Sequence, residues 1–119
     1  MHNMLTWLTD RHTAIMEIEE KGRQMIEKGD QTAFIGLMRE KAEIILALSE
    51  QARVFYPYLP ESVCRQAEKE LGRFSKSAAN SLNLDSAFYM SALLYRDDHQ
   101  PEEPDNLALC IERLGVLFI

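Results

Sequence analysis

The chain has 119 residues, 46% hydrophobic and 27% charged, a globular mixture that fits a single domain over residues 1–119. Thirteen basic and 19 acidic residues give a net charge of −6, which argues against bulk binding to nucleic acid or to an anionic membrane. Two cysteines are too few for a disulfide framework.

Residue usage favours helices over strands. Valine occurs three times, whereas Leu, Ala, Glu, Met, Lys and Arg dominate, and no run alternates between apolar and polar residues. We therefore expect an all-α fold, an up-and-down helical bundle with four main helices and a short C-terminal helix.

The first half of the chain predicts an antiparallel helical hairpin. Apolar residues recur every three to four positions over about residues 3–28 and again over about residues 31–56. Between these helices, Gly29 suits the left-handed position that ends a helix, and Asp30 suits the N-cap of the next one. A connection this short joins antiparallel neighbours.

The second half predicts three further helices. Pro57 and Pro60 interrupt the pattern, and a third helix with regular apolar spacing follows over about residues 61–82. Asp85 then predicts a turn and the N-cap of a fourth helix over about residues 86–95, although one continuous helix across the turn is the alternative.

The C-terminal part of the chain predicts an exposed acidic loop over residues 97–104. Asp105 is the expected N-cap of the last helix, which should extend to about Phe118. An apolar end of this kind should pack against the rest of the chain or against a second copy.

No segment has the pattern of a cleavable signal peptide or a membrane span, so we expect a cytoplasmic protein with free thiols. The sequence lacks the glycine-rich phosphate loops and the HExxH and CxxC motifs that identify common enzyme and metal sites. Cys64 and Cys110 are expected to be small buried residues.

Four basic residues of the third helix form one row, which we call the basic stripe: Arg65, Lys69, Arg73 and Lys76. From residue 97 onward the chain carries six acidic residues and one basic residue. The basic stripe is interpreted either as a solvated helix face, as a contact for the acidic loop or a partner, or as a site for an anion.

Two pairs of glutamates supply an alternative function. Glu17 with Glu20, and Glu40 with Glu43, have the E-x-x-E spacing that metal-dependent all-α phosphohydrolases use. The chain lacks the EExxE motif of those enzymes, and both pairs point away from the predicted apolar stripes. His12, within the first apolar stripe, is expected to be a hydrogen-bonded structural residue, with phosphotransfer as the alternative.

A turn motif, Lys28-Gly29-Asp30, lies within residues 24–48 between two runs at helical spacing. The positions that carry the pattern after the turn are Phe34, Leu37, Lys41, Ile45 and Leu48. This stretch resembles the helical hairpin of FlgN-type flagellar export chaperones. The resemblance implies a small, acidic, cytosolic helical protein that binds C-terminal segments of secreted proteins.

We therefore predict a non-enzymatic protein-interaction module, such as an adaptor, a chaperone or a regulatory subunit, that binds a partner helix through apolar helix faces. We expect no cofactor, no nucleic acid and no membrane as partner, and a homodimer, because the apolar surface exceeds what one small copy covers easily. The candidate partner-binding residues are Phe55, Tyr56, Tyr58, Arg65, Lys69, Arg73, Lys76, Leu117 and Phe118.

Overall fold

A computed structural model describes residues 3–117, which form an all-α fold with no strand in that range. In chain order the elements are α1 (Asn3–Glu27), α2 (Gln31–Ala52), the 3-10 helix η1 (Arg53–Tyr58), α3 (Glu61–Asn83), α4 (Ala87–Ala92) and α5 (Asn106–Val116). The predicted all-α bundle with a short C-terminal helix is confirmed.

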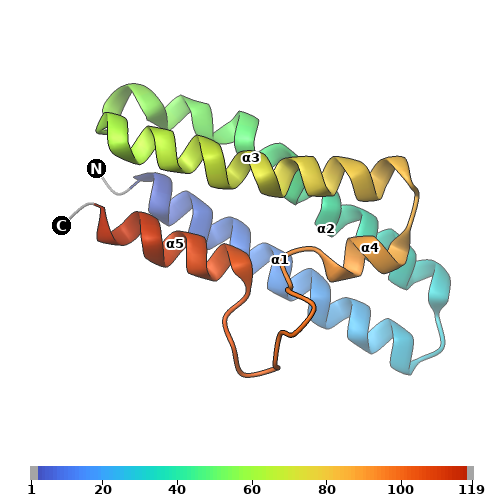
Figure 1. Cartoon of the computed structure of the whole chain (residues 1–119). Helices are drawn as coiled ribbons and strands as arrows, with labels where there is room; N and C mark the ends of the chain where they lie inside the picture. The colour runs from blue at the N-terminus through green and yellow to red at the C-terminus, as the bar shows by residue number, and fades with distance from the viewer. Residues whose placement is uncertain (1–2, 118–119) are drawn as a thin grey trace.

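The three long helices run up and down, with α2 packed against both α1 and α3 (Figure 1). α5 lies alongside α1, and the short α4 lies against α2. The core residues that contribute the largest fully buried apolar side chains are Met4, Leu8, Ile15, Ile45, Leu48, Val63, Leu71, Met90, Leu107, Cys110 and Leu114. No helix within residues 3–117 has an apolar stretch long enough to cross a bilayer.

The turn between α1 and α2 has the predicted chemistry. Gly29 has a φ of 78°, and its N–H donates to the Ile26 carbonyl at 3.0 Å, so it ends α1 in the left-handed conformation. Asp30 caps α2, because its side chain accepts a hydrogen bond from the Ala33 N–H at 3.1 Å. The predicted hairpin is thereby confirmed.

α2 ends earlier than the predicted residue 56. The α-helix stops at Ala52, and the chain tightens into the 3-10 helix Arg53–Tyr58, which contains Pro57. Proline lacks an N–H and its ring clashes with the preceding turn, so the α-helix cannot continue through this position. The prediction of one α-helix over residues 31–56 was wrong at its end for this reason.

The predicted turn between α3 and α4 is present, but its caps differ from the prediction. Asp85 has a φ of 50° and lies just beyond the α3 C-cap, where its N–H donates to the Leu82 carbonyl at 3.0 Å. Ser86 is the N-cap of α4, since its side chain accepts from the Tyr89 N–H at 3.2 Å. The role of N-cap predicted for Asp85 was therefore wrong: its backbone ends α3 instead.

α4 ends at Ala92 rather than near residue 95. Leu93 is extended and Leu94 has a φ of 76°, which bends the chain out of the helix. This bend buries both leucine side chains and lets the Leu94 carbonyl accept the Asn106 N–H at 2.8 Å. Tertiary contacts thus override the local helical pattern.

α5 begins where predicted, because the Asp105 side chain accepts the Ala108 N–H at 2.9 Å. The helix ends at Val116, and Leu117 is its C-cap. Phe118, to which the helix was predicted to extend, lies outside the described residues.

Candidate functional site

Two adjoining cavities lie between α3 and the segments that face it, and we refer to them together as the α3 groove. The larger has a volume of about 390 Å³ and the smaller about 290 Å³. Both are lined by Phe74, Ser77 and Asn106, so their walls are continuous.

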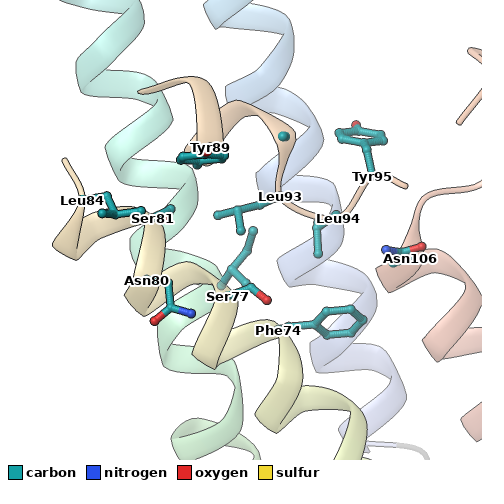
Figure 2. A pocket seen from close by; sticks show the side chains of 12 residues that line it. Phe74, Ser77, Asn80, Ser81, Leu84, Tyr89, Leu93, Leu94, Tyr95 and Asn106 are labelled. Atoms are coloured by element: carbon teal, nitrogen blue, oxygen red, sulfur yellow. The ribbon is translucent and has the colours of Figure 1, made fainter. Parts of the chain in front are cut away.

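One wall of the α3 groove is a single side of α3. Its residues recur at three- and four-residue steps, which places them on one helical face. Figure 2 shows Phe74, Ser77, Asn80 and Ser81 on this face of the helix. Ser77 and Asn80 are exposed, so the α3 groove opens to solvent along this wall.

The opposite wall is formed by α4, the segment that follows it and α5. Tyr89, Leu93, Leu94 and Tyr95 line the larger cavity on this side (Figure 2). This wall exists because Leu94 adopts its left-handed conformation and turns the chain toward α5. α5 continues the wall past the smaller cavity with Asn106, Leu109 and Arg113.

One end of the α3 groove is charged. Arg113 of α5 donates to Glu70 of α3, with Nε 2.9 Å from Glu70 Oε1, and Gln66 donates to the other carboxylate oxygen at 2.8 Å. Burial by itself would raise the pKa of Glu70, but the hydrogen bonds from Arg113 and Gln66 lower it below its usual value. Glu70 therefore stays ionised and holds α5 beside α3 at this end.

The basic stripe runs along the outer edge of the same α3 wall, and Arg73 belongs to both. Arg65 pairs with Glu61 at 2.5 Å, one turn earlier in α3. Within residues 3–117, no carboxylate lies within 4.0 Å of Lys69, Arg73 or Lys76. The structure thus places three unpaired cations beside the α3 groove.

A second cluster centres on Lys41, whose side chain is fully buried. Its Nζ lies 2.9 Å from Glu19 Oε2 on α1 and donates to the Ser91 carbonyl of α4 at 2.9 Å. The Tyr95 hydroxyl donates to the other Glu19 oxygen, and Lys41 Nζ lies 5.2 Å from the centre of the Tyr95 ring. Lys41 therefore ties α1 and α2 to the segment that forms the second wall of the α3 groove.

The electrostatics of this cluster follow from its burial. Burial lowers the pKa of Lys41, and this effect outweighs the raising effect of the Glu19 charge. Burial also raises the pKa of Tyr95, with further contributions from its hydrogen bond to Glu19. A lysine with a lowered pKa suits nucleophilic chemistry, but neither cavity of the α3 groove includes Lys41 in its wall. The geometry accordingly supports a positioning role for Lys41.

Three of the predicted partner-binding residues, Phe55, Tyr56 and Tyr58, differ in burial. Phe55 packs against Trp7 with ring centres 5.5 Å apart, and Tyr56 is half-buried, with a pKa raised to about 12 by burial. Tyr58 is 84% exposed. Leu117 is also exposed, and the predicted partner residue Phe118 lies outside the described residues. The α3 groove is not lined by Phe55, Tyr56, Tyr58 or Leu117.

The four glutamates of the alternative function, Glu17, Glu20, Glu40 and Glu43, are all exposed. Glu20 is hydrogen-bonded to Arg23 on its own helix. Within residues 3–117 no three His, Cys, Asp or Glu side chains come together in an arrangement suited to a metal ion.

The other singled-out residues have structural partners. His12 Nε2 donates to the Asp105 carboxylate at 2.7 Å, so it ties α1 to the start of α5. The half-buried Cys64 thiol donates to the Tyr56 carbonyl at 3.3 Å, and Cys110 is buried; neither forms a disulfide within the described part of the chain.

No family model, curated protein or solved structure matches this chain. The site is therefore defined by its own geometry.

Sequence reasoning found one edge of the α3 groove, the basic stripe, but missed the groove itself. The signal for Lys41 was present: it lies three residues after Met38 and four before Ile45, both buried, so it occupies an apolar position of α2. No local signal revealed the second wall, because that wall depends on contacts between Leu94 and Asn106 across a loop.

Proposed function

We propose that this protein is a non-enzymatic protein-interaction module that binds an amphipathic helix of another protein in the α3 groove. The observation that carries the proposal is the continuous groove itself, with its two cavities and their shared wall. Helix-in-groove binding uses apolar anchors at helical spacing, which such a row of cavities accommodates.

The larger cavity is wide enough for such anchors. A cavity of about 150 Å³ holds one benzene ring, whereas the larger cavity here has about 390 Å³. Its lining includes the exposed side chains Leu84 and Tyr89 and the buried Leu93 and Leu94. Two large apolar side chains of a partner therefore have room to leave water in this cavity, which favours binding.

The shape of the groove favours a helix over a small molecule. Its α3 wall extends from Glu70 to Leu84, which at 1.5 Å per residue is about 21 Å, or close to four helical turns. A small ligand uses an enclosed pocket with converging polar groups. An elongated groove that is open along Ser77 and Asn80 suits an extended partner segment instead.

The proposal covers an adaptor, a chaperone or a regulatory subunit, each of which can bind a partner helix in this way. The resemblance of residues 24–48 to FlgN-type export chaperones agrees with this proposal, and we also propose a cytoplasmic location. The predicted homodimer stays a prediction.

The experiment uses a display library of amphipathic helices of about 18 residues, five helical turns, with varied apolar and flanking positions. The affinity of the selected peptides for wild type and for Ser77→Trp is then measured by fluorescence anisotropy. Ser77 is exposed and lines both cavities, so the indole is placed where they meet. We expect affinity to fall by at least about tenfold, since anchor burial in the groove is lost. Circular dichroism confirms that the variant is folded.

The matched control is Gln51→Trp, at an exposed uncharged position of α2 that does not line the groove. It should leave the affinity within about twofold, a change well below 1 kcal/mol. Selected peptides that bind Ser77→Trp as well as wild type overturn the proposal. So does a dimer, seen by sedimentation, that Ser77→Trp dissociates, because a second copy is then the occupant.

A further inference from the structure

The three unpaired cations of the basic stripe border one side of the proposed helix-binding groove. Lys69, Arg73 and Lys76 are spaced by four and three residues, so they follow one edge of α3 over two helical turns. Arg73 lines the smaller cavity, and the two lysines lie on the solvent side of the same wall.

The three unpaired cations lie together on one edge of α3, whereas most basic residues of this protein are paired with a carboxylate. In the described part of the chain, seven of the 13 Lys and Arg residues lie within 4.0 Å of a carboxylate. The six that do not are Arg11, Lys21, Lys28, Lys69, Arg73 and Lys76, and half of these line one edge of α3. In a chain with a net charge of −6, this edge is a local concentration of positive charge.

The chain's own acidic loop does not neutralise this edge. Its residues Asp98 and Glu103 pair instead with Arg96, each at 3.2 Å, directly before the loop. No ion pair within residues 3–117 joins the loop to the basic stripe. The contact between loop and stripe raised from the sequence is thus not formed.

From this charge complementarity we infer that the partner helix carries acidic side chains along the edge that faces Lys69, Arg73 and Lys76. The inference rests on the proposed function and adds the chemistry of the partner. Apolar anchors fill the larger cavity of the α3 groove, and Glu or Asp residues at steps of three and four positions pair with the stripe. Opposite charges at the groove edge favour this partner over a basic helix and select one orientation in the groove.

The test compares three peptides with the same apolar face, taken from the groove-dependent selection described above. Their flanking positions are all Glu, all Gln or all Lys. Exposed ion pairs are individually weak, so we expect the Glu peptide to bind about tenfold more tightly than the Lys peptide at low salt, with the Gln peptide between them. Raising the ionic strength should shrink this difference.

A double charge reversal in the protein tests whether the acidic edge of the peptide lies against the basic stripe. Lys69→Glu with Lys76→Glu should weaken the Glu peptide and strengthen the Lys peptide, reversing their order. Lys21→Glu with Lys28→Glu is the matched control, because it makes the same charge change at two other exposed, unpaired lysines. The control should keep the original order of the peptides.

The outcomes separate the two proposals. If the Glu and Lys peptides bind wild type equally and both bind Ser77→Trp more weakly, the inference of an acidic partner helix is overturned. The same result supports binding in the α3 groove. Peptides whose binding Ser77→Trp does not affect overturn the proposed function. A poly(dT) oligonucleotide that binds wild type and loses binding in Lys69→Glu with Lys76→Glu overturns the acidic helix in favour of nucleic acid.

Discussion

Lys41 Nζ lies 2.9 Å from Glu19 Oε2. The lysine side chain is fully buried and the glutamate side chain is only partly exposed. This pair links α2 to α1 inside the bundle. The hydrogen bond from Lys41 to the Ser91 carbonyl extends the link to α4.

Lys41→Met should lower the free energy of unfolding by about 3 kcal/mol, because Glu19 loses its buried cationic partner. The measurement is urea denaturation followed by circular dichroism. Lys41→Met combined with Glu19→Gln should regain a large part of this loss, since the unpaired carboxylate is then gone. A single variant as stable as wild type would show that the pair makes no net contribution.

The buried thiol of Cys110 should make the protein less stable in alkali. Burial, and next the negative charge of Glu70, raise the pKa of Cys110 from 9.0 to about 12. Between these values the unfolded state gives up the thiol proton and the folded state keeps it, so stability falls as the pH rises. At pH 10 the loss amounts to about 1 kcal/mol relative to pH 8.

The variant that tests this effect is Cys110→Ala, compared with wild type by urea denaturation at pH 8 and pH 10. The difference in stability between the two proteins should shrink by about 1 kcal/mol as the pH rises. Lys41 has the opposite effect, because a lowered pKa makes its contribution to the stability of the folded state rise with pH up to 10.5. This effect is equal in both proteins and leaves their difference unchanged. A difference that is constant with pH would contradict the prediction.

Asp105 caps α5 with one oxygen and accepts a hydrogen bond from His12 with the other. Asp105→Ala removes both contacts and should cost about 2 kcal/mol, near 1 for the cap and near 1 for the hydrogen bond. Asp105→Asn keeps an oxygen for the cap and should cost less than half as much. Hydrogen exchange at the Ala108 N–H distinguishes them: it should speed up in the alanine variant and change little in the asparagine variant.

The left-handed backbone of Asp85 predicts a strong dependence on the side chain placed there. Glycine adopts a φ of 50° without strain, so Asp85→Gly should change stability by less than about 0.5 kcal/mol even though it removes the exposed ion pair with Arg39. Asp85→Val should cost about 1–2 kcal/mol, because a branched side chain disfavours this conformation.

Thermal unfolding monitored by circular dichroism measures both changes at Asp85, and Arg39→Ala gives the contribution of the ion pair alone. Equal stabilities for the glycine and valine variants would mean that the turn relaxes to another backbone conformation.

The helical hairpin of α1 and α2 could be predicted from residues close together in the sequence. Gly29 and Asp30 specified the end of α1 and the start of α2, since a left-handed residue and a side-chain cap act within a few positions of the chain. The N-cap of α5, Asp105, was predicted from the sequence in the same way. Asp85 was misassigned, because aspartate suits both the N-cap and the left-handed position, and only the fold chose between them.

By itself the sequence determined the all-α class, the approximate helices and the row of basic residues beside the groove, because helical periodicity and capping are properties of neighbouring residues. Only the tertiary structure decided that α4 stops at Ala92, that Leu94 turns back to meet Asn106, and that Lys41 lies buried against Glu19. These features depend on contacts between residues far apart in the chain. Their energies outweigh local preference, and no pattern in a single segment encodes them.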